Sequence, residues 1–301
     1  MKKRDLKVRL IHNPGAGADK KYTKSDLIKL IEANNYQCEY TSSESHALKN
    51  ISPDTDFIAI AGGDGTVRGT IMKLLDQKLK SKRPIAVFPL GTANNIATSL
   101  GIHTDIEKYV EHWSAHQLKK FDVGQVTGLK DDAYFLESFG FGLFPKLMQA
   151  LEEKDADKAS SANDEFKDAL KTMLAITEEY EPVKLTVKTD EELIEQDCLL
   201  LEIMNISSLG PKLKLSKDAD PGDGYFDMIL ITKDQRELFQ TYLKQCLNDE
   251  EPEFPIKPVK VRSLTIQWNG KDVHADDEIL KGYKGEEIQV SLLDSLIEIV
   301  V

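Results

Sequence analysis

Three short segments in the first hundred residues combine glycine with asparagine, aspartate or threonine, a composition suited to binding phosphate. They are Asn13-Pro-Gly-Ala-Gly17, Gly62-Gly-Asp-Gly-Thr66 and Pro89-Leu-Gly-Thr-Ala-Asn94, named here the first, second and third loops. Glycine lets the backbone approach an anionic ligand closely, and a helix that follows such a loop directs its free N–H groups at an anion. A carboxylate among phosphates makes sense mainly if it serves a divalent cation or a proton transfer, so Asp64 points to catalysis.

Two threonines and two absent motifs limit the kinds of phosphate-binding site that the sequence can form. The hydroxyls of Thr66 and Thr92 can donate to phosphate or ribose, or cap the following helices. One Gly-Gly-Asp-Gly segment alone is compatible with a simple tight turn, but three loops of this kind favour a shared anion site. No Walker A loop is present, and Lys20 stands where the third glycine of a G-x-G-x-x-G fingerprint would be. The sequence therefore does not support a P-loop or a Rossmann dinucleotide site.

The elements around the loops predict an α/β domain. Strand patterns at 7–12, 36–40, 56–61 and 84–88 alternate with helical patterns at 22–34, 67–75 and 92–100. Such alternation predicts a parallel sheet with right-handed crossovers. Ligands bind at the carboxyl ends of the strands in such sheets, and each of the three loops follows a strand.

The pattern changes near residue 120 to strands that suggest a mostly antiparallel, β-rich region. These strands are predicted at 121–127, 133–140, 183–189, 193–206, 225–232, 263–268 and 288–293, with a helical stretch at 144–180 and a last strand at 295–301. We therefore expect a nucleotide domain of residues 1–120 and 294–301 and a second domain of residues 121–293. Phe139, Phe141 and Phe144 are expected in its core, with a groove for a lipid tail as the alternative.

Composition limits the class of protein. The net charge of −12 over 301 residues argues against a nucleic-acid binder held by phosphate contacts. Cys38, Cys198 and Cys246 form no C-x-x-C pair, so a reducing cytoplasm is expected. No signal peptide or membrane-spanning run is apparent, and contact with a membrane surface is expected to be transient. The oligomeric state stays open, a homodimer included.

The three loops, in this order and spacing, resemble those of the diacylglycerol kinase catalytic domain superfamily, which includes sphingosine kinases and bacterial lipid kinases. The likeness continues with Lys120-Phe-Asp122-Val-Gly, Asp220-Pro-Gly-Asp223-Gly-Tyr-Phe-Asp227 and Ala275-Asp-Asp-Glu278. The resemblance implies an α/β nucleotide domain, a β-rich second domain and a cleft between them. It also implies ATP as the phosphate donor, Mg²⁺ as a cofactor and a lipid hydroxyl as the acceptor, met at a membrane surface.

The resemblance assigns roles residue by residue. The nucleotide would be held by Asn13, Pro14, Gly15, Ala16, Gly17, Thr41, Gly62, Gly63, Asp64, Gly65, Thr66 and Thr92. Glu278 stands where relatives place the proton acceptor, with Asp64 as its magnesium or base partner. Asp122 matches a carboxylate linked to activity or substrate handling. Asp220, Asp223 and the carbonyl of Tyr225 match a magnesium site that supports structure.

The sequence departs from the family pattern at Asn95, at Arg68-Gly69 and at Asp277. The family usually has aspartate, Asn-Glu and glycine, respectively, at these positions. The departures allow an altered substrate, a slow kinase or a protein that binds nucleotide or lipid without catalysis. An enzyme similar to NAD kinases is a further alternative, because that family also carries a Gly-Gly-Asp-Gly loop.

Overall fold

The computed structural model describes residues 6–15, 22–44, 51–76, 83–102, 105–113, 117–154, 162–210 and 213–301. The chain divides into two compact units, Met1–Phe121 with Ser295–Val301, and Asp122–Asp294. The domain boundaries expected from the sequence each differ by one residue from the boundaries of these units. Strand β5 (Leu118–Thr127) leaves the first unit and β17 (Ile288–Val300) returns to it.

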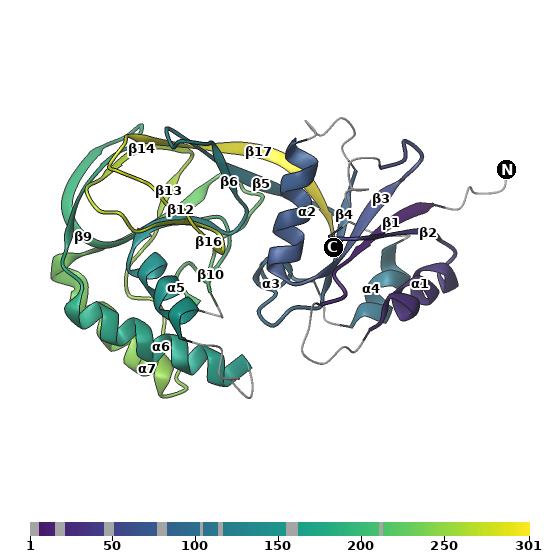
Figure 1. The fold of residues 1–301 in the computed structure, drawn as a ribbon, viewed down its shortest axis with the longest axis horizontal. Helices are drawn as coiled ribbons and strands as arrows, with labels where there is room; N and C mark the ends of the chain where they lie inside the picture. The colour runs from purple at the N-terminus through teal and green to yellow at the C-terminus, as the bar shows by residue number, and fades with distance from the viewer. Residues whose placement is uncertain are drawn as a thin grey trace. The chain divides into compact units, whose positions relative to one another are not determined.

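The first unit contains the predicted parallel sheet (Figure 1). Its strands are β1 (Lys7–His12), β2 (Gln37–Ser42), β3 (Phe57–Gly62) and β4 (Ile85–Pro89). Strand β1 pairs in parallel with β2 and β3, and β3 pairs in parallel with β4. All six residues of β3 are buried, as expected for a central strand covered on both faces. The end of β17 adds to this sheet through Ile299 opposite Ile85.

The described part of the first unit contains four α-helices. They are α1 (Lys24–Ala33), α2 (Asp64–Asp76), α3 (Asn95–Ser99) and α4 (Ile106–His112). Helix α1 begins with a capping box, in which the Thr23 hydroxyl and the Asp26 carboxylate exchange hydrogen bonds with each other's backbone N–H groups. Leu27 and Ile31 bury one side of this helix. Local sequence signals therefore account for the start and the buried face of this helix.

The second unit is a mostly antiparallel sheet. Its strands besides β5 and β17 are β6 (Ala133–Phe135), β7 (Ser138–Gly142), β8 (Val183–Lys188), β9 (Leu193–Met204), β10 (Ser208–Leu209), β11 (Leu213–Lys214), β12 (Phe226–Thr232), β13 (Val259–Val261), β14 (Ser263–Trp268), β15 (Val273–Ala275) and β16 (Glu278–Ile279). The main path runs β16-β15-β7-β9-β8-β14-β17. The predicted fold class is confirmed.

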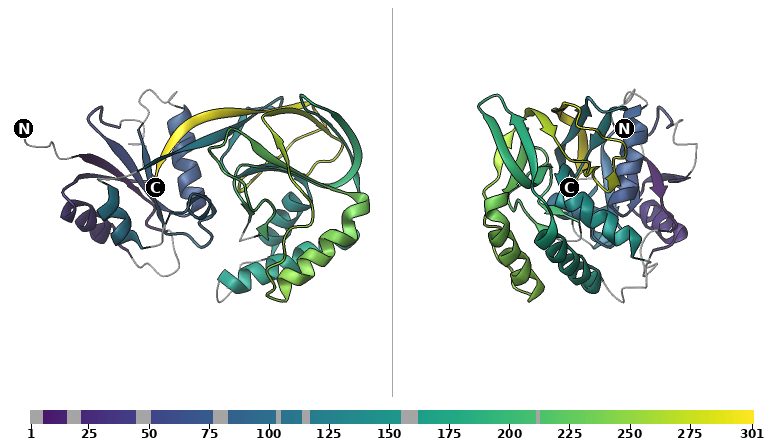
Figure 2. Two further views of the ribbon diagram at one scale, coloured as in Figure 1. Left: turned by 180° about the vertical axis from the view of Figure 1, so that it is seen from behind. Right: turned by 60° about the vertical axis from the view of Figure 1, so that its left-hand side comes forward.

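Three helices cover one face of this sheet (Figure 2). They are α5 (Leu143–Glu153), α6 (Ala162–Glu179) and α7 (Arg236–Leu247), with α6 in contact with both of the others. Alternate strand residues enter two separate cores, so Ile229 and Ile231 pack on the helices while Met228 packs on the opposite side. Phe139 and Phe141 are fully buried in the core away from the helices, which confirms core packing for this pair.

Several predicted elements differ from the structure. The expected strand 133–140 is two strands, because the chain turns at residues 136–137, where backbone N–H groups bind the Asp276 carboxylate. The runs 288–293 and 295–301 form the single strand β17. Helix α7 was not predicted, although Phe239, Tyr242 and Leu243 have helical spacing. Strands β10, β11, β13, β15 and β16 have two or three residues each, too few to show a period.

None of the helices in the described part of the chain combines the length and apolar character needed to cross a bilayer.

Candidate active site

The first and second loops are joined by side chains. The Asn13 amide nitrogen donates to the Thr66 hydroxyl at 3.1 Å, and the Asn13 amide oxygen accepts from the Gly15 backbone N–H at 2.9 Å. Asn13 follows β1, and Thr66 lies in the first turn of α2, after β3. Because β1 and β3 are parallel neighbours, their carboxyl ends meet and the two loops lie together.

The second and third loops touch through their backbones. The Leu90 N–H donates to the Gly62 carbonyl at 3.0 Å. A side-chain Cβ at Gly91 would lie closer than 3.0 Å to the Cα of Gly63, a distance that real Cβ atoms essentially never show. Glycine at position 91 is therefore required for these two loops to adjoin. We name the described parts of the three loops, which these contacts join, the loop cluster.

Asp64 binds the start of helix α3. Its two carboxylate oxygens accept from the backbone N–H groups of Asn95 at 2.9 Å and Ile96 at 3.1 Å. Asn94, the residue before the helix, has a left-handed backbone with φ of 53° and makes no side-chain cap. The second loop thus caps the helix that follows the third loop. Two N–H groups at this helix terminus are thus bound by the protein's own carboxylate, and contact of the terminus with a ligand phosphate stays a prediction.

Thr66 and Thr92 do not cap the helices that follow their loops, so the alternative of a capping role is wrong. Helix α2 begins at Asp64, so Thr66 is already inside it, and α3 begins at Asn95, three residues after Thr92. Thr92 is exposed in the third loop, and the Thr66 hydroxyl contacts Asn13. Contact of either hydroxyl with a nucleotide stays a prediction.

Replacement of Asp64 by alanine is expected to loosen the third loop. Loss of a helix cap typically costs about 0.5–2 kcal/mol, and here the cap also joins two loops, so ATP affinity should fall together with stability. Asp105→Ala is the matched control, because Asp105 caps α4 through the Lys108 N–H away from the loops. Thermal denaturation and ATP titration of both variants check this; equal ATP affinities of the two would contradict it.

The other residues that are predicted to bind the nucleotide differ in burial and position. Ala16 and Gly17 lie outside the described residues, whereas Pro14 and Gly15 are exposed at the end of β1. Thr41 is buried in β2, and its hydroxyl accepts from the Arg9 guanidinium at 2.9 Å. The arrangement places Thr41 on the strand beside β1. Its contact with nucleotide stays a prediction.

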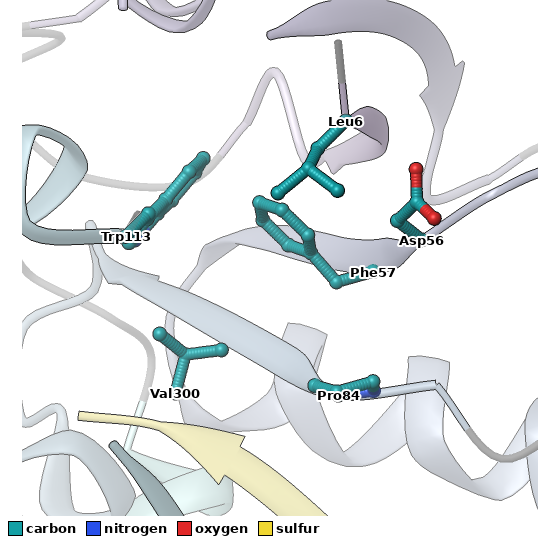
Figure 3. Close-up of a pocket in the computed structure, with 6 residues that line it drawn as sticks. All are labelled: Leu6, Asp56, Phe57, Pro84, Trp113 and Val300. Carbon is teal, nitrogen blue, oxygen red and sulfur yellow. The ribbon is translucent and has the colours of Figure 1, made fainter. Parts of the chain in front are cut away.

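A cavity of about 200 Å³ in the first unit lies at the wrong end of the sheet to hold phosphate (Figure 3). It is lined by Leu6, Asp56, Phe57, Pro84, Trp113 and Val300. Leu6, Phe57 and Pro84 are at the amino ends of β1, β3 and β4, whereas the loop cluster is at their carboxyl ends. The Asp56 carboxylate is engaged by the Lys7 N–H at 2.7 Å. The cavity therefore lies at the end of the sheet opposite the loop cluster.

Glu278 lies in the second unit, in a tight hairpin. Strands β15 and β16 pair Ala275 with Glu278, so the turn consists of Asp276 and Asp277, and the Glu278 side chain is exposed. Asp276, the first residue of this turn, has a left-handed backbone with φ of 51°. The Asp276 carboxylate accepts from the backbone N–H groups of residues 136–138 at 2.8 to 3.1 Å. The hairpin is thereby attached to the adjoining chain.

Asp122 is fully buried in the second unit. One carboxylate oxygen accepts from the Gly224 N–H at 2.9 Å, and the Asp122 N–H donates to the Pro221 carbonyl at 2.6 Å. These bonds hold the turn that contains Asp220 and Asp223. In this structure Asp122 supports a neighbouring turn, and its contact with substrate stays a prediction.

One of the expected magnesium ligands, Asp223, contacts a lysine. The Lys260 ammonium lies 2.7 Å from one oxygen of Asp223 and 3.3 Å from Asp227, while the other Asp223 oxygen accepts from the Tyr225 N–H at 2.9 Å. Asp220 accepts from the Gly222 N–H at 3.1 Å. Burial raises the pKa of Asp227, and the contact with Asp223 helps to raise the pKa of Lys260 against the effect of burial. The lysine competes with a cation for Asp223, and Mg²⁺ binding by Asp220, Asp223 and the Tyr225 carbonyl stays a prediction.

Lys260→Met is therefore expected to strengthen Mg²⁺ binding at the Asp220–Asp223 turn. Removal of a positive charge from a partly buried carboxylate pair should raise cation affinity about tenfold or more. Calorimetric titration of the nucleotide-free protein measures it, with the exposed Lys257→Met as the matched control. If neither variant changes Mg²⁺ affinity, the turn is not a metal site.

In the described residues, no three His, Cys, Asp or Glu side chains come together in a way that could hold a metal ion. The expected site uses two carboxylates and a carbonyl, so this finding does not bear on it.

Sequence reasoning missed a fully buried polar pair in the second unit, Glu202 and His274. The nitrogen Nε2 of His274 lies 3.0 Å from one carboxyl oxygen of Glu202. The available signal was the isolated charge of Glu202 within the apolar run 199–204. An ionisable residue inside a buried strand needs a partner, but the sequence does not say which.

Comparisons with known proteins agree with the geometry of both units. Residues 7–126 match the family model described as the diacylglycerol kinase catalytic domain, and residues 148–290 match the YegS C-terminal NAD kinase beta sandwich-like domain. A diacylglycerol kinase of Bacillus subtilis is 27% identical over 245 residues, which are 75% of this chain and 74% of the relative. One from Staphylococcus aureus (strain bovine RF122 / ET3-1) is 26% identical over 277 residues, covering 87% and 84%.

A crystal structure of a diacylglycerol kinase from Bacillus anthracis str. Sterne is similar in fold. The TM-score is 0.74 at 22% identity, and the match covers 99% of this chain and 98% of that chain. At this level of identity the likeness concerns the fold alone.

Proposed function

The chain belongs to the diacylglycerol kinase catalytic domain family, and we propose that it transfers the γ-phosphate of ATP to the hydroxyl group of a lipid of the diacylglycerol type. The observation that supports this most is the loop cluster. Asn13, Thr66 and the Gly63–Gly91 contact bring three glycine-bearing loops together at the carboxyl ends of adjacent parallel strands. Exposed backbone without bulky side chains at this position suits a polyphosphate.

Transfer requires a group that accepts the proton of the lipid hydroxyl. In the proposed reaction the hydroxyl oxygen forms a bond to the γ-phosphorus, the bond between that phosphorus and the leaving ADP oxygen breaks, and Glu278 takes the proton. Mg²⁺ would arrive with ATP and neutralise phosphate charge. Asp64 would keep the second and third loops together through its bonds to Asn95 and Ile96. The proposal requires both units to act on one pair of substrates.

The lipid substrate determines where in the cell the protein would act. A diacylglycerol-like lipid resides in a membrane, and the chain has a net charge of −12, which disfavours strong attraction to an anionic surface. We therefore propose a cytoplasmic protein that meets its lipid by transient contact with the membrane surface.

A catalytically impaired binder is the second candidate. Both carboxylate oxygens of Asp64 already accept from backbone N–H groups, and Asn95 replaces a family carboxylate. Such a protein would retain the loop cluster and bind ATP without transferring phosphate.

Incubation of the purified chain with radiolabelled ATP, Mg²⁺ and mixed micelles tests the proposal. The micelles would contain diacylglycerol, monoacylglycerol, ceramide or sphingosine in parallel, with NAD as a soluble acceptor. Label in one lipid product is the expected result. Label in NAD alone would favour an NAD kinase activity, and calorimetric ATP binding without any labelled product would favour the binder.

A further inference from the structure

Glu202 and His274 come from different strands but meet over a glycine. Gly140 in β7 is opposite Glu202 in β9 and opposite His274 in β15. The neighbours of all three residues along their strands, among them Phe139 and Ile203, belong to the core on the face away from the helices. Because side chains alternate along a strand, Glu202 and His274 share the helix-covered face. The ring of Phe144 in α5 packs on the ring of His274, with 4.8 Å between the two ring centroids.

The contact depends on the absence of a side chain at position 140. A Cβ atom there would lie closer than 3.0 Å to the Glu202 carboxyl group. The Glu202 side chain therefore extends across Gly140 and reaches His274, with both oxygens 3.0 and 3.1 Å from Nε2. The pair is fully buried.

The hydrogen-bond partners of His274 and Glu202 determine how many protons the pair holds. Nδ1 of His274 lies 2.8 Å from the Asp276 carbonyl oxygen, which can only accept, so Nδ1 carries a hydrogen. Nε2 and the Glu202 oxygens would both be acceptors without a further hydrogen, so one proton lies between them. The pair is then neutral overall, whether that proton resides on the carboxyl or on the ring.

The surroundings favour retention of this shared proton. Burial raises the pKa of Glu202. Burial alone would lower the pKa of His274, but the charge and hydrogen bond of Glu202, together with Asp276, outweigh it and raise that pKa. Without this proton, the buried Glu202 carboxylate would face the lone pair on Nε2 of His274.

His274 fastens the turn that precedes Glu278. The Asp276 carbonyl accepts from His274, the Asp276 N–H donates to the Ser138 carbonyl at 2.8 Å, and its carboxylate binds three backbone N–H groups. Every polar group of Asp276 is thus held by buried parts of the second unit. Two residues later the exposed Glu278 side chain begins.

We propose that Glu202 and His274 form a positioning pair, which sets the backbone of the 276–279 turn and through it the direction of Glu278 toward the acceptor hydroxyl. The inference rests on the proposed function, since it gives Glu278 a role in proton transfer. Neither residue of the pair touches substrate in this scheme. A displacement of about 1 Å in a catalytic group can slow a reaction about a hundredfold, so such a support has a measurable effect.

An apolar replacement of the pair tests the proposal without leaving a buried charge unpaired. Glu202→Val combined with His274→Leu keeps nearly the same total side-chain volume and an apolar contact with Phe144, and such replacements are often tolerated by folding. Phosphate transfer should become about tenfold to a hundredfold slower, with unchanged ATP affinity. Glu202→Gln should stay near the native rate, because its amide can still donate to Nε2. Glu195→Gln, an exposed change on the same strand, is the control.

The effect must pass through Glu278. In a Glu278→Gln background the apolar pair should cause no further loss of rate, because the group that it positions has already been removed. An equal loss in both backgrounds would mean a general structural role and would overturn the proposal.

Hydrogen exchange separates this inference from the proposed function. The N–H groups of residues 276–279 should exchange faster in the apolar variant than in the native chain or Glu195→Gln. Unchanged exchange overturns the anchoring itself, even in a protein without activity. A native chain that phosphorylates no lipid overturns the proposed function and the catalytic part of this inference, while faster exchange would still support the anchored turn.

Discussion

A Gly91→Ala variant should lose most of its affinity for ATP. The added Cβ would lie closer than 3.0 Å to the Gly63 Cα, and the opposing atom belongs to backbone, so one loop must move. Overpacking of this kind costs about 1–3 kcal/mol. If that cost falls on the nucleotide-binding arrangement, affinity drops about tenfold to a hundredfold. Calorimetric or fluorescence titration with ATP measures it.

Gly69→Ala is the matched glycine control. Gly69 lies within α2, and an added Cβ there meets no atom within 4 Å. Alanine in a helix interior should stabilise the protein by about 0.5–1 kcal/mol relative to glycine. We expect a slightly higher melting temperature and native ATP affinity. Native affinity in Gly91→Ala as well would mean that the contact between the second and third loops does not shape the nucleotide site.

Glu278→Gln should lower the turnover number with little effect on ATP affinity. The amide has the shape of the carboxylate but cannot accept the proton of the lipid hydroxyl. Loss of a general base typically slows a reaction about 10²- to 10⁴-fold. The experiment measures turnover and the Michaelis constant for ATP with whichever lipid the native chain phosphorylates.

The exposed neighbour Asp277 provides the control for this change. Asp277→Asn removes the same charge from the same turn, so it separates a local electrostatic effect from proton transfer. It should keep a rate near that of the native chain. Two equally slow variants, or a Glu278→Gln variant with native turnover, would assign the proton transfer to another group.

The sequence by itself determined the parallel strands of the first unit. Strands β1, β3 and β4 lie within one residue of their predicted starts and ends, because each is a short segment rich in Val, Ile, Leu, Ala or Phe next to a polar turn. The loops follow these strands directly in the chain, so their gathering at one edge of the sheet follows from parallel topology alone. The family motifs likewise reside in contiguous residues.

Only the tertiary structure decided which groups meet across the fold. The bonds from Asp64 to Asn95 and Ile96 join residues about thirty positions apart, and no local pattern encodes them. The contact between Glu202 and His274 depends on the register of three strands and on a glycine in the middle one, so it appears only when β9, β7 and β15 are paired. Propensity acts over a few residues, whereas side-chain chemistry acts between strands that lie far apart in sequence.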